Sequence, residues 1–465
     1  MTRPNILWIL SDQHNADAWG GAIQTPALDA LSAEGTTFGH AYCQGPLCVP
    51  ARASLLTERY VSEHGVRDNR WQQTGELPTV VQRIRDAGYR TTAIGKMHLY
   101  RYPPDVRDGR ETMRQHGFSE AYEILGKYGV IGGTSAYTEE LEERGLLAGY
   151  REFLAERDPH HGAPGDRVPH WTTDPAPLPA DAHPDAWVGR RTADWIRDYR
   201  GTEPFFLWAG FPGPHDPWDA PAEYTDRYDP AEIPLPRSLT PPEPATGDFG
   251  RYVDAIRRYC TSETVDLDVI RRVRRHYYGA VTMIDHWIGA IVDALAARPD
   301  LANTWIVYSS DHGEMLGEHR MFTKWLFHEP SVRVPLIIRP PGGQSPIRYD
   351  ELVEHLDLSA TLAELAGAPP LPDADGRSLL PAVSGDLRPI RDVVRSECET
   401  FGMWRTRDCK LVVDEQTRTP VQLFDLQRDP DEDHDVHADP GYADVVREMM
   451  DTHVRPDLAR SHGPG

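Results

Sequence analysis

Cys48 lies in a segment that suits a nucleophile. Residues 45–57 place Pro50 two positions and Arg52 four positions after this cysteine, followed by residues that favour a helix. Proline has a fixed φ angle, lacks an N–H group and favours the first turn of a helix. We therefore expect Cys48 at or just before a helix N-terminus, where free N–H groups and the helix dipole stabilise an anion. Arg52 would add a fixed positive charge one turn further on.

Two simpler interpretations of Cys48 are compatible with the same segment. One is a buried structural cysteine ahead of an ordinary helix. The other is a thiolate nucleophile with a lowered pKa, which would need a histidine base. The other four cysteines are expected to serve packing, because the five together fit no zinc or disulfide spacing: Cys43, Cys260, Cys398 and Cys409.

Two pairs of polar residues suit a divalent cation. Asp12 and Gln13 follow the apolar run 5–10, and Asp311 and His312 follow a second apolar run near 304–309. Two carboxylates, an amide oxygen and an imidazole are ligands for a divalent ion rather than for a structural tetrahedral zinc. Such an ion would polarise a nucleophile and a substrate oxygen. The alternative is that the two aspartates only cap turns after strands.

The charge of the chain limits its partners. The formal net charge is −23, which argues against a nucleic-acid-binding protein, since these need basic patches. An anionic substrate would be repelled by the average field and would need a local cluster of positive groups. Arg52 is one candidate for this cluster, and Lys96 and His215 after expected strands are others.

Alternating strand and helix patterns predict the fold class. The pattern indicates an α/β protein with a mostly parallel sheet flanked by helices. Ligands of such sheets bind outside the carboxyl ends of the strands. Asp12, Lys96 and Asp311 each follow an expected strand directly, and His215 follows one after a short loop. We therefore expect these four side chains at one edge of the sheet.

The same patterns predict the domain organisation. Residues 1–375 should form the catalytic domain, with a long insertion or lid at 100–183, where Pro, Gly, His and charged residues obscure periodicity. Residues 376–465 should form a small C-terminal α+β subdomain around an antiparallel sheet, with short strands at 388–394, 403–406, 409–413 and 422–425.

The composition predicts a cytoplasmic protein. Hydrophobic residues make up 39% of the chain and the mean hydropathy is −0.55, and no apolar run approaches the length of a membrane span. The N-terminal apolar run is too short for a secretory signal. We expect no membrane partner, and the sequence is compatible with a homo-oligomer.

The segment around Cys48 resembles the signature of type I sulfatases, which belong to the alkaline-phosphatase-like superfamily. Cys-x-Pro-x-Arg followed by Ala-Ser-Leu-Leu-Thr carries the resemblance, and further motifs extend it over residues 3–370. It implies that a formylglycine-generating enzyme converts Cys48 to formylglycine, whose hydrated aldehyde is the nucleophile. His312 resembles the variant of iduronate-2-sulfatase-like and phosphonate-monoester-hydrolase-like members. Glu58 is a departure, because the family commonly has glycine there.

The resemblance also implies roles for individual residues. Lys96 would bind the sulfate oxygens, and His98 would orient the formylglycine hydroxyl. His215 would contact the sulfate and the leaving-group oxygen, and Lys324 would hold the sulfate and the bridging oxygen. Arg52 would stabilise the diol, and Asn69 is a weaker candidate for substrate contact. The implied metal ligands are Asp12, Gln13, Cys48 in its modified form, Asp311 and His312, with Ca²⁺ the usual ion and Mn²⁺ or Mg²⁺ as alternatives.

The predicted function is hydrolysis of a sulfate ester of a small molecule or saccharide, releasing sulfate and an alcohol. One hydroxyl of the diol would attack sulfur and the alcohol would leave with a proton. The second hydroxyl, once deprotonated, would expel sulfate and restore the aldehyde. The first alternative is a phosphonate monoester or phosphodiester hydrolase with the same nucleophile, although Lys96 and His98 favour sulfate esters. The second is a non-catalytic binding protein on the same fold.

Overall fold

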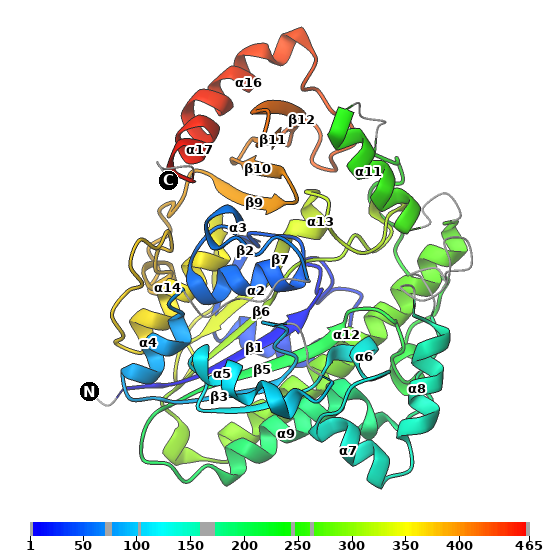
Figure 1. The fold of residues 1–465 in the computed structure, drawn as a ribbon, viewed down its shortest axis with the longest axis vertical. Helices are drawn as coiled ribbons and strands as arrows, with labels where there is room; N and C mark the ends of the chain where they lie inside the picture. The colour runs from blue at the N-terminus through cyan, green and yellow to red at the C-terminus, as the bar shows by residue number, and fades with distance from the viewer. Residues whose placement is uncertain are drawn as a thin grey trace.

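A central sheet forms the core of the protein in the computed structural model, which describes residues 3–69, 77–100, 104–158, 173–242, 247–260 and 265–461. Within these residues, the sheet has eight strands (Figure 1). All pairings are parallel except those of β7, so the predicted mostly parallel sheet is confirmed. The order is β4 (Glu120–Glu123), β3 (Arg90–Gly95), β5 (Phe205–Pro214), β1 (Asn5–Asp12), β6 (Thr304–Ser310), β7 (Arg333–Arg339), β2 (Thr36–Tyr42) and β8 (Ile347–Glu354).

Strand β1 explains why the sheet is covered on both faces. All eight of its residues are buried, and successive side chains point to opposite faces. Ile6, Trp8 and Leu10 join one hydrophobic cluster, and Leu7 and Ile9 join another. The first cluster includes residues of α2 (Cys48–Thr57), α4 (Val80–Asp86) and α14 (His355–Leu365), and the second residues of α1 (Pro26–Ala33), α9 (Pro184–Asp198) and α12 (Leu267–Ala296).

The carboxyl ends of four parallel strands meet at one edge of the sheet. Asp12 is the last residue of β1, and Lys96 directly follows β3. His215 directly follows β5, and Asp311 directly follows β6. The prediction that these four residues gather at one edge is confirmed for their strands by the parallel pairing of β1 with β5 and β6 and of β3 with β5.

The segment expected to be a long insertion or lid, 100–183, contributes to the main sheet. Its strand β4 pairs in parallel with β3, and its described part holds helices rather than only loop. The pattern was obscured because β4 is only four residues long and mostly half-buried at the sheet edge. Strands β2 and β8 were also not predicted. The helices are α5 (Arg110–Gln115), α6 (Gly126–Gly129), α7 (Ala136–Glu143) and α8 (Leu147–Glu156).

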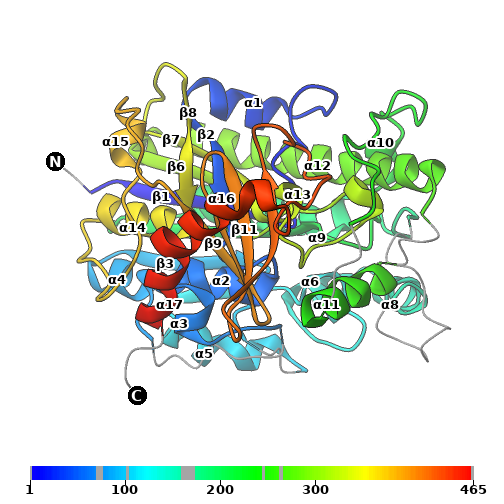
Figure 2. The same ribbon diagram turned by 90° about the horizontal axis from the view of Figure 1, so that it is seen from above.

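The C-terminal region forms a separate four-stranded antiparallel sheet, as predicted. The strand expected at 388–394 is wrong, because β9 begins at the last of those residues. Strand β9 holds Arg395 and Glu397, which are buried as an ion pair. Charged residues inside a strand hide its hydrophobic pattern in the sequence. Helices α16 (Ala443–Met449) and α17 (Arg455–Ser461) lie beside this sheet (Figure 2). The strands are β9 (Val394–Cys398), β10 (Phe401–Arg405), β11 (Cys409–Asp414) and β12 (Thr419–Asp425).

Helix α12 is the one helix in the described residues that is long and apolar enough to cross a membrane by length and composition. Of its most apolar 18-residue window, 61% is buried inside the protein. Its apolar side chains Ile284, Ile288 and Ile291 lie in the hydrophobic cluster beneath the sheet. Packing of a core helix therefore accounts for its composition.

Candidate active site

Cys48 is the first residue of helix α2, as the sequence predicted. Leu47 before it has extended backbone, and every residue of the helix is buried. The Asn69 side-chain oxygen accepts a hydrogen bond from the Val49 N–H at 3.0 Å. Asn69 therefore contacts the first turn of the helix that carries Cys48, and it satisfies one of the free N–H groups there.

Four side chains converge on one point at the sheet edge. Asp12, Cys48, Asp311 and His312 each offer a ligand atom, and these atoms lie within 4.8 Å of one another. The Cys48 sulfur lies 3.2 Å from His312 Nε2 and 3.8 Å from Asp12 Oδ1. His312 Nδ1 lies 2.9 Å from the Gly313 carbonyl and can only donate to it. The Nε2 atom is then the basic nitrogen and faces the cluster, as metal-binding histidines require.

Gln13 differs from the other predicted metal ligands. It is in the left-handed region at φ 66°, and its N–H donates to Asp311 Oδ1 at 3.0 Å. Its side-chain oxygen accepts a hydrogen bond from Lys324, and its side-chain nitrogen donates to Glu314. Gln13 therefore lies next to the Asp311 carboxylate with its side-chain oxygen bonded to Lys324, and its role as a metal ligand stays a prediction.

Arg52 joins the two aspartates of the cluster. Its Nη2 lies 3.0 Å from Asp12 Oδ2, and its Nε lies 2.8 Å from Asp311 Oδ2. The remaining nitrogen, Nη1, donates to the carbonyls of Lys96 at 2.7 Å and Met97 at 3.0 Å. All three side chains of these ion pairs are fully buried. One guanidinium therefore fixes β1, β3 and β6 relative to the helix that carries Cys48.

The two predicted lysines come from distant parts of the chain. Lys96 Nζ lies 2.6 Å from Asp12 Oδ2. Lys324 Nζ lies 2.8 Å from His215 Nε2, and both lysines are almost fully buried. His215 Nδ1 lies 2.7 Å from the Asp216 carbonyl, so its Nε2 is the atom that faces Lys324. Lys96 and Lys324 thus supply positive charge for an anionic substrate, and His215 lies in contact with Lys324.

The charges around Cys48 outweigh its burial. Burial alone would raise the pKa of the Cys48 thiol, but Lys324, Lys96 and His312 hold it well below its ordinary value. Burial likewise raises the pKa of Asp12, and Lys96, His215 and Arg52 lower it to about 2. Position 48 is therefore a place where negative charge is stabilised.

His98 is the second histidine beside Cys48. Burial lowers the pKa of its imidazole, and a hydrogen bond with Cys48 acts in the opposite direction. Its backbone is in the left-handed region at φ 50°, three residues after the end of β3. A neutral imidazole in contact with residue 48 has the right form for a base.

The site also uses residues that the sequence reading did not select. Buried Glu314 accepts hydrogen bonds from the Leu316 and Thr323 N–H groups as well as from Gln13. Burial raises the pKa of Glu314 to about 7. Its place directly after the Asp-His-Gly run was a usable signal. A buried ion pair of Lys127 with Asp219 carried no such signal, because the partners are far apart in sequence.

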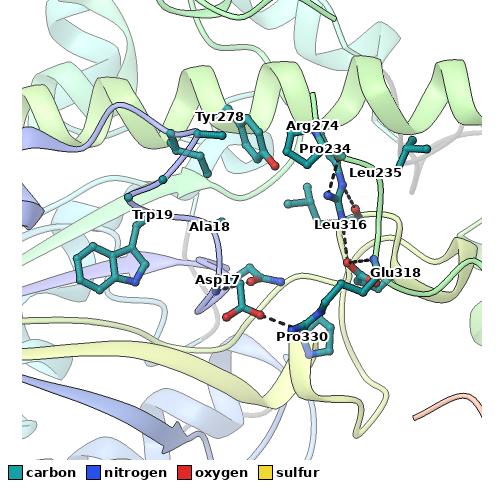
Figure 3. Close-up of a pocket in the computed structure, with 16 residues that line it drawn as sticks. Asp17, Ala18, Trp19, Pro234, Leu235, Arg274, Tyr278, Leu316, Glu318 and Pro330 are labelled. Atoms are coloured by element: carbon teal, nitrogen blue, oxygen red, sulfur yellow. Dashed lines mark hydrogen bonds and ion pairs between the residues drawn. The ribbon is translucent and has the colours of Figure 1, made fainter. Parts of the chain in front are cut away.

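A separate pocket of about 320 Å³ opens beside the loop that follows β1 (Figure 3). Asp17, Trp19 and Tyr278 are among the residues that line it. Its two arginines are paired with carboxylates: Arg274 with Glu318 at 2.9 Å and Arg237 with Asp17 at 3.1 Å. None of the predicted site residues lines this pocket.

The fold and the residues at the sheet edge define a hydrolase of the alkaline-phosphatase-like type. The sequence model of the sulfatase family matches residues 4–368, and the model for the N-sulphoglucosamine sulphohydrolase C-terminal region matches residues 317–456. The chain belongs to the sulfatase family and is a sulfuric ester hydrolase. The second match crosses the expected boundary at residue 375, which stays a prediction.

Individual relatives cover nearly the whole chain. It is 31% identical to an arylsulfatase of Clostridium perfringens, over 92% of this chain and 89% of that protein. It is 29% identical to a multifunctional alkaline phosphatase superfamily protein of Trinickia caryophylli, over 96% and 94%. A solved phosphonate monoester hydrolase from Silicibacter pomeroyi superposes with a TM-score of 0.81 at 24% identity, over 98% of this chain and 95% of that one. This last likeness shows the fold.

Proposed function

We propose that this enzyme hydrolyses a small-molecule or saccharide sulfate ester through a formylglycine at position 48. The observation that carries the proposal is the position of Cys48. It begins a buried helix, lies 3.2 Å from His312 Nε2, and is surrounded by Lys96, Lys324 and Arg52. A hydrated aldehyde there would present a hydroxyl in a site arranged to stabilise negative charge. Family membership supports the modification, which relatives of this kind share.

The donor set at the sheet edge fits a divalent cation. Asp12, Asp311 and His312 would hold it together with residue 48, and Gln13 would join them on releasing Lys324. The ion would act as a Lewis acid that polarises the nucleophile and a substrate oxygen. Oxygen ligands favour Ca²⁺ or Mg²⁺, and the imidazole makes Mn²⁺ suitable as well.

Other residues of the site then bind the sulfate, hold the aspartates and transfer protons. Lys96 and Lys324 neutralise the sulfate oxygens, and Arg52 lowers the pKa of Asp12 and holds both aspartates in place. His215 and Lys324 are in contact with each other and supply the proton for the departing alcohol. His98 takes the proton from the second hydroxyl of residue 48, which releases sulfate and restores the aldehyde.

One experiment tests this proposal directly. Peptide mass spectrometry across residue 48 is combined with metal analysis and with rates on an aryl sulfate, using protein from the native host. We expect a formylglycine at position 48, about one bound divalent ion for each chain, and turnover that Cys48→Ala abolishes. An active enzyme with an unmodified thiol would exclude the formylglycine mechanism and support the thiolate interpretation.

Phosphonate monoester hydrolysis is the second candidate function. His312 in the metal cluster favours it, and so does the similarity to a multifunctional relative. A sulfate monoester and a phosphonate monoester both carry one negative charge, so the same lysines suit both. Parallel kcat/KM values on matched aryl sulfate and phenyl phosphonate esters decide between them, and a large phosphonate preference would overturn our first choice.

A further inference from the structure

The loop that carries His215 is tied down by a buried ion pair. Lys127 Nζ lies 2.7 Å from Asp219 Oδ1 and donates to the Pro217 carbonyl at 2.9 Å. The side chains of Lys127 and Asp219 are 1% and 0% exposed. A charged pair with so little access to water is costly to bury, so it is kept only with further partners or for a specific purpose.

Asp219 has those further partners. His183 Nε2 lies 3.3 Å from its Oδ1, and the Tyr150 hydroxyl donates to its Oδ2 at 3.2 Å. Burial alone would raise the pKa of Asp219, but Lys127 and His183 hold it well below its usual range. The residue four positions after His215 is therefore an ionised, fully bonded anchor that joins α6, α8 and the start of α9.

The start of the same loop is fixed in a similar way. Asp185, in the first turn of α9, accepts a hydrogen bond from the Gly213 N–H at 2.8 Å. A side chain at Gly213 would meet the Asp185 carboxylate at 2.6 Å, so the contact is close. The loop 213–219 is thus held at both ends, and His215 lies between the two attachments.

The turn between β4 and α6 links this anchor to Lys96. Gly126 has φ +69°, and a Cβ built on it would lie 3.4 Å from Lys96 Cε and 3.7 Å from Lys96 Nζ. Gly126 therefore packs on the lysine that faces Asp12, and its neighbour Lys127 holds the loop of His215. One short turn contacts both sides of the proposed sulfate-ester site.

We propose that Lys127 and Asp219 are positioning residues that set the imidazole of His215 against the leaving-group oxygen. This inference rests on the proposed function, because it assigns His215 to the departing alcohol. Neither residue touches substrate. Their loss should let the loop 213–219 shift, and the contact between His215 and Lys324 should then lengthen.

Leaving-group dependence separates positioning from mere stability. A poor leaving group needs a proton as its bond breaks, whereas a good one leaves as an anion. Misplacing His215 should therefore slow phenyl esters much more than 4-nitrophenyl esters. A loss of folded enzyme would lower both rates by the same factor.

The test uses variants that keep the buried charges balanced. Lys127→Arg retains the charge, and Lys127→Met with Asp219→Asn removes both charges together. Arg391→Met is the matched control, because Arg391 also forms a buried pair, with Asp357, away from the loop. We expect the double variant to lose roughly tenfold or more on a phenyl ester and less than about threefold on the 4-nitrophenyl ester, since general-acid contacts contribute about 10²–10⁴. Lys127→Arg should recover most of the difference.

A uniform loss on all esters in the double variant, as in Arg391→Met, would overturn the inference. The proposed function is judged separately by the wild-type enzyme, which must hydrolyse the sulfate or the phosphonate series. If it hydrolyses neither, the inference is judged by ¹⁵N NMR of the His215 imidazole, assigned with a His215→Asn variant. A shifted His215 signal in the double variant supports positioning, and an unchanged signal contradicts it.

Discussion

Arg52 shows how one side chain can organise a site without touching the reaction. Its guanidinium uses all three nitrogens, with two carboxylates and two carbonyls as partners. A lysine in its place has a single nitrogen and could not reach all four. The charge lowers the pKa of Asp12, and the planar geometry holds Asp12 and Asp311 beside each other.

Replacing Arg52 should make stability depend on metal. Arg52→Met removes the counter-charge that two buried carboxylates share and leaves Asp12 with Lys96 alone, which should cost about 3–5 kcal/mol of unfolding free energy in chelator. A divalent cation can neutralise the same carboxylates, so adding Ca²⁺ or Mn²⁺ should restore much of this loss. Urea unfolding with EDTA and with each ion measures the difference.

The control for this prediction is Arg391→Met. Arg391 pairs with Asp357 at 2.5 Å and Glu354 at 3.1 Å, and its side chain is similarly buried. It should lose comparable stability, but equally with and without metal. If Arg52→Met responds to chelation no more than wild type does, the aspartates do not share a cation.

At the scale of elements, the sequence predicted the four strands and the helix start that carry the candidate site residues. Strands β1, β5 and β6 contain continuous apolar runs that are typical of buried parallel strands, whereas the apolar run of β3 is short and follows Arg90 and two threonines. Cys48 at the start of α2 was predictable because proline and the apolar residues after it have strong local preferences. Short-range chemistry was therefore sufficient for the positions of Asp12, Lys96 and Asp311.

The elements that were missed depend on contacts between distant residues. Strand β4 is short and half-buried, and it is stabilised by pairing with β3 rather than by its own pattern. Lys127 resembles any surface lysine until Asp219, 92 positions later, lies beside it. Glu314 follows a local run of site residues, but its bond with Gln13 forms only when two distant parts of the chain meet. No local preference encodes these pairs.

The end of helix α2 carries a residue that suits its place poorly. Glu58 closes the helix with φ 53° and ψ 35°, a left-handed conformation that glycine adopts more easily. It is also buried, and among the described residues its Oε1 has no hydrogen-bond partner. Burial and the nearby Asp357 raise the pKa of Glu58 from 4.5 to about 7.

Glu58 should make the protein less stable as pH rises. The folded state holds the Glu58 proton more tightly than the unfolded state, so its contribution is full below about pH 4.5 and is lost as pH rises through about 7. Glu58→Gln removes the ionisation and should gain stability on the order of 3 kcal/mol at pH 8 and little at pH 4.5. Urea unfolding between these pH values measures the gain.

A Glu58→Gly variant separates the effect of the ionisable carboxyl from the effect of the left-handed backbone. Glu58→Gly should show the same pH-dependent gain as Glu58→Gln, with an additional gain of about 1 kcal/mol that does not vary with pH, from relief of the left-handed backbone. A Glu58→Gln variant whose stability keeps the wild-type pH dependence would show that the carboxyl does not titrate in this range.

At the scale of the whole molecule, charge is distributed unevenly. The chain carries a net −23, yet Arg52, Lys96 and Lys324 are buried together around position 48. A buried cation is screened little by salt, whereas the acidic surface is screened strongly. The site can therefore attract an anion at short range within a molecule whose net charge is strongly negative.

The buried Lys410 joins the C-terminal sheet to the segment before β7. Lys410 of β11 pairs with Glu329 at 2.9 Å and with Glu432, and it donates to the Phe327 carbonyl at 2.8 Å. Glu329 begins α13 (Glu329–Val332), and its N–H donates to Glu432 at 2.7 Å. Lys410 thus connects β11, the segment before β7 and the acidic turn at 429–433.

Removing Lys410 should loosen this junction and leave the chemistry unchanged. Lys410→Met removes the counter-charge that two buried glutamates share, although Glu329 keeps Arg333 and Arg405, and it should cost up to about 3–5 kcal/mol of unfolding free energy. Because burial opposes the charge of Glu329 and Lys410 sustains it, the loss should be largest above neutral pH and smaller as acid protonates the carboxylates.

The double variant Lys410→Met with Glu432→Gln should recover part of the lost stability. Urea unfolding measures these differences, and kcat per folded molecule should stay at the wild-type value. A changed leaving-group dependence in Lys410→Met would show instead that the C-terminal sheet acts on the catalytic centre, through Phe327 and Lys324.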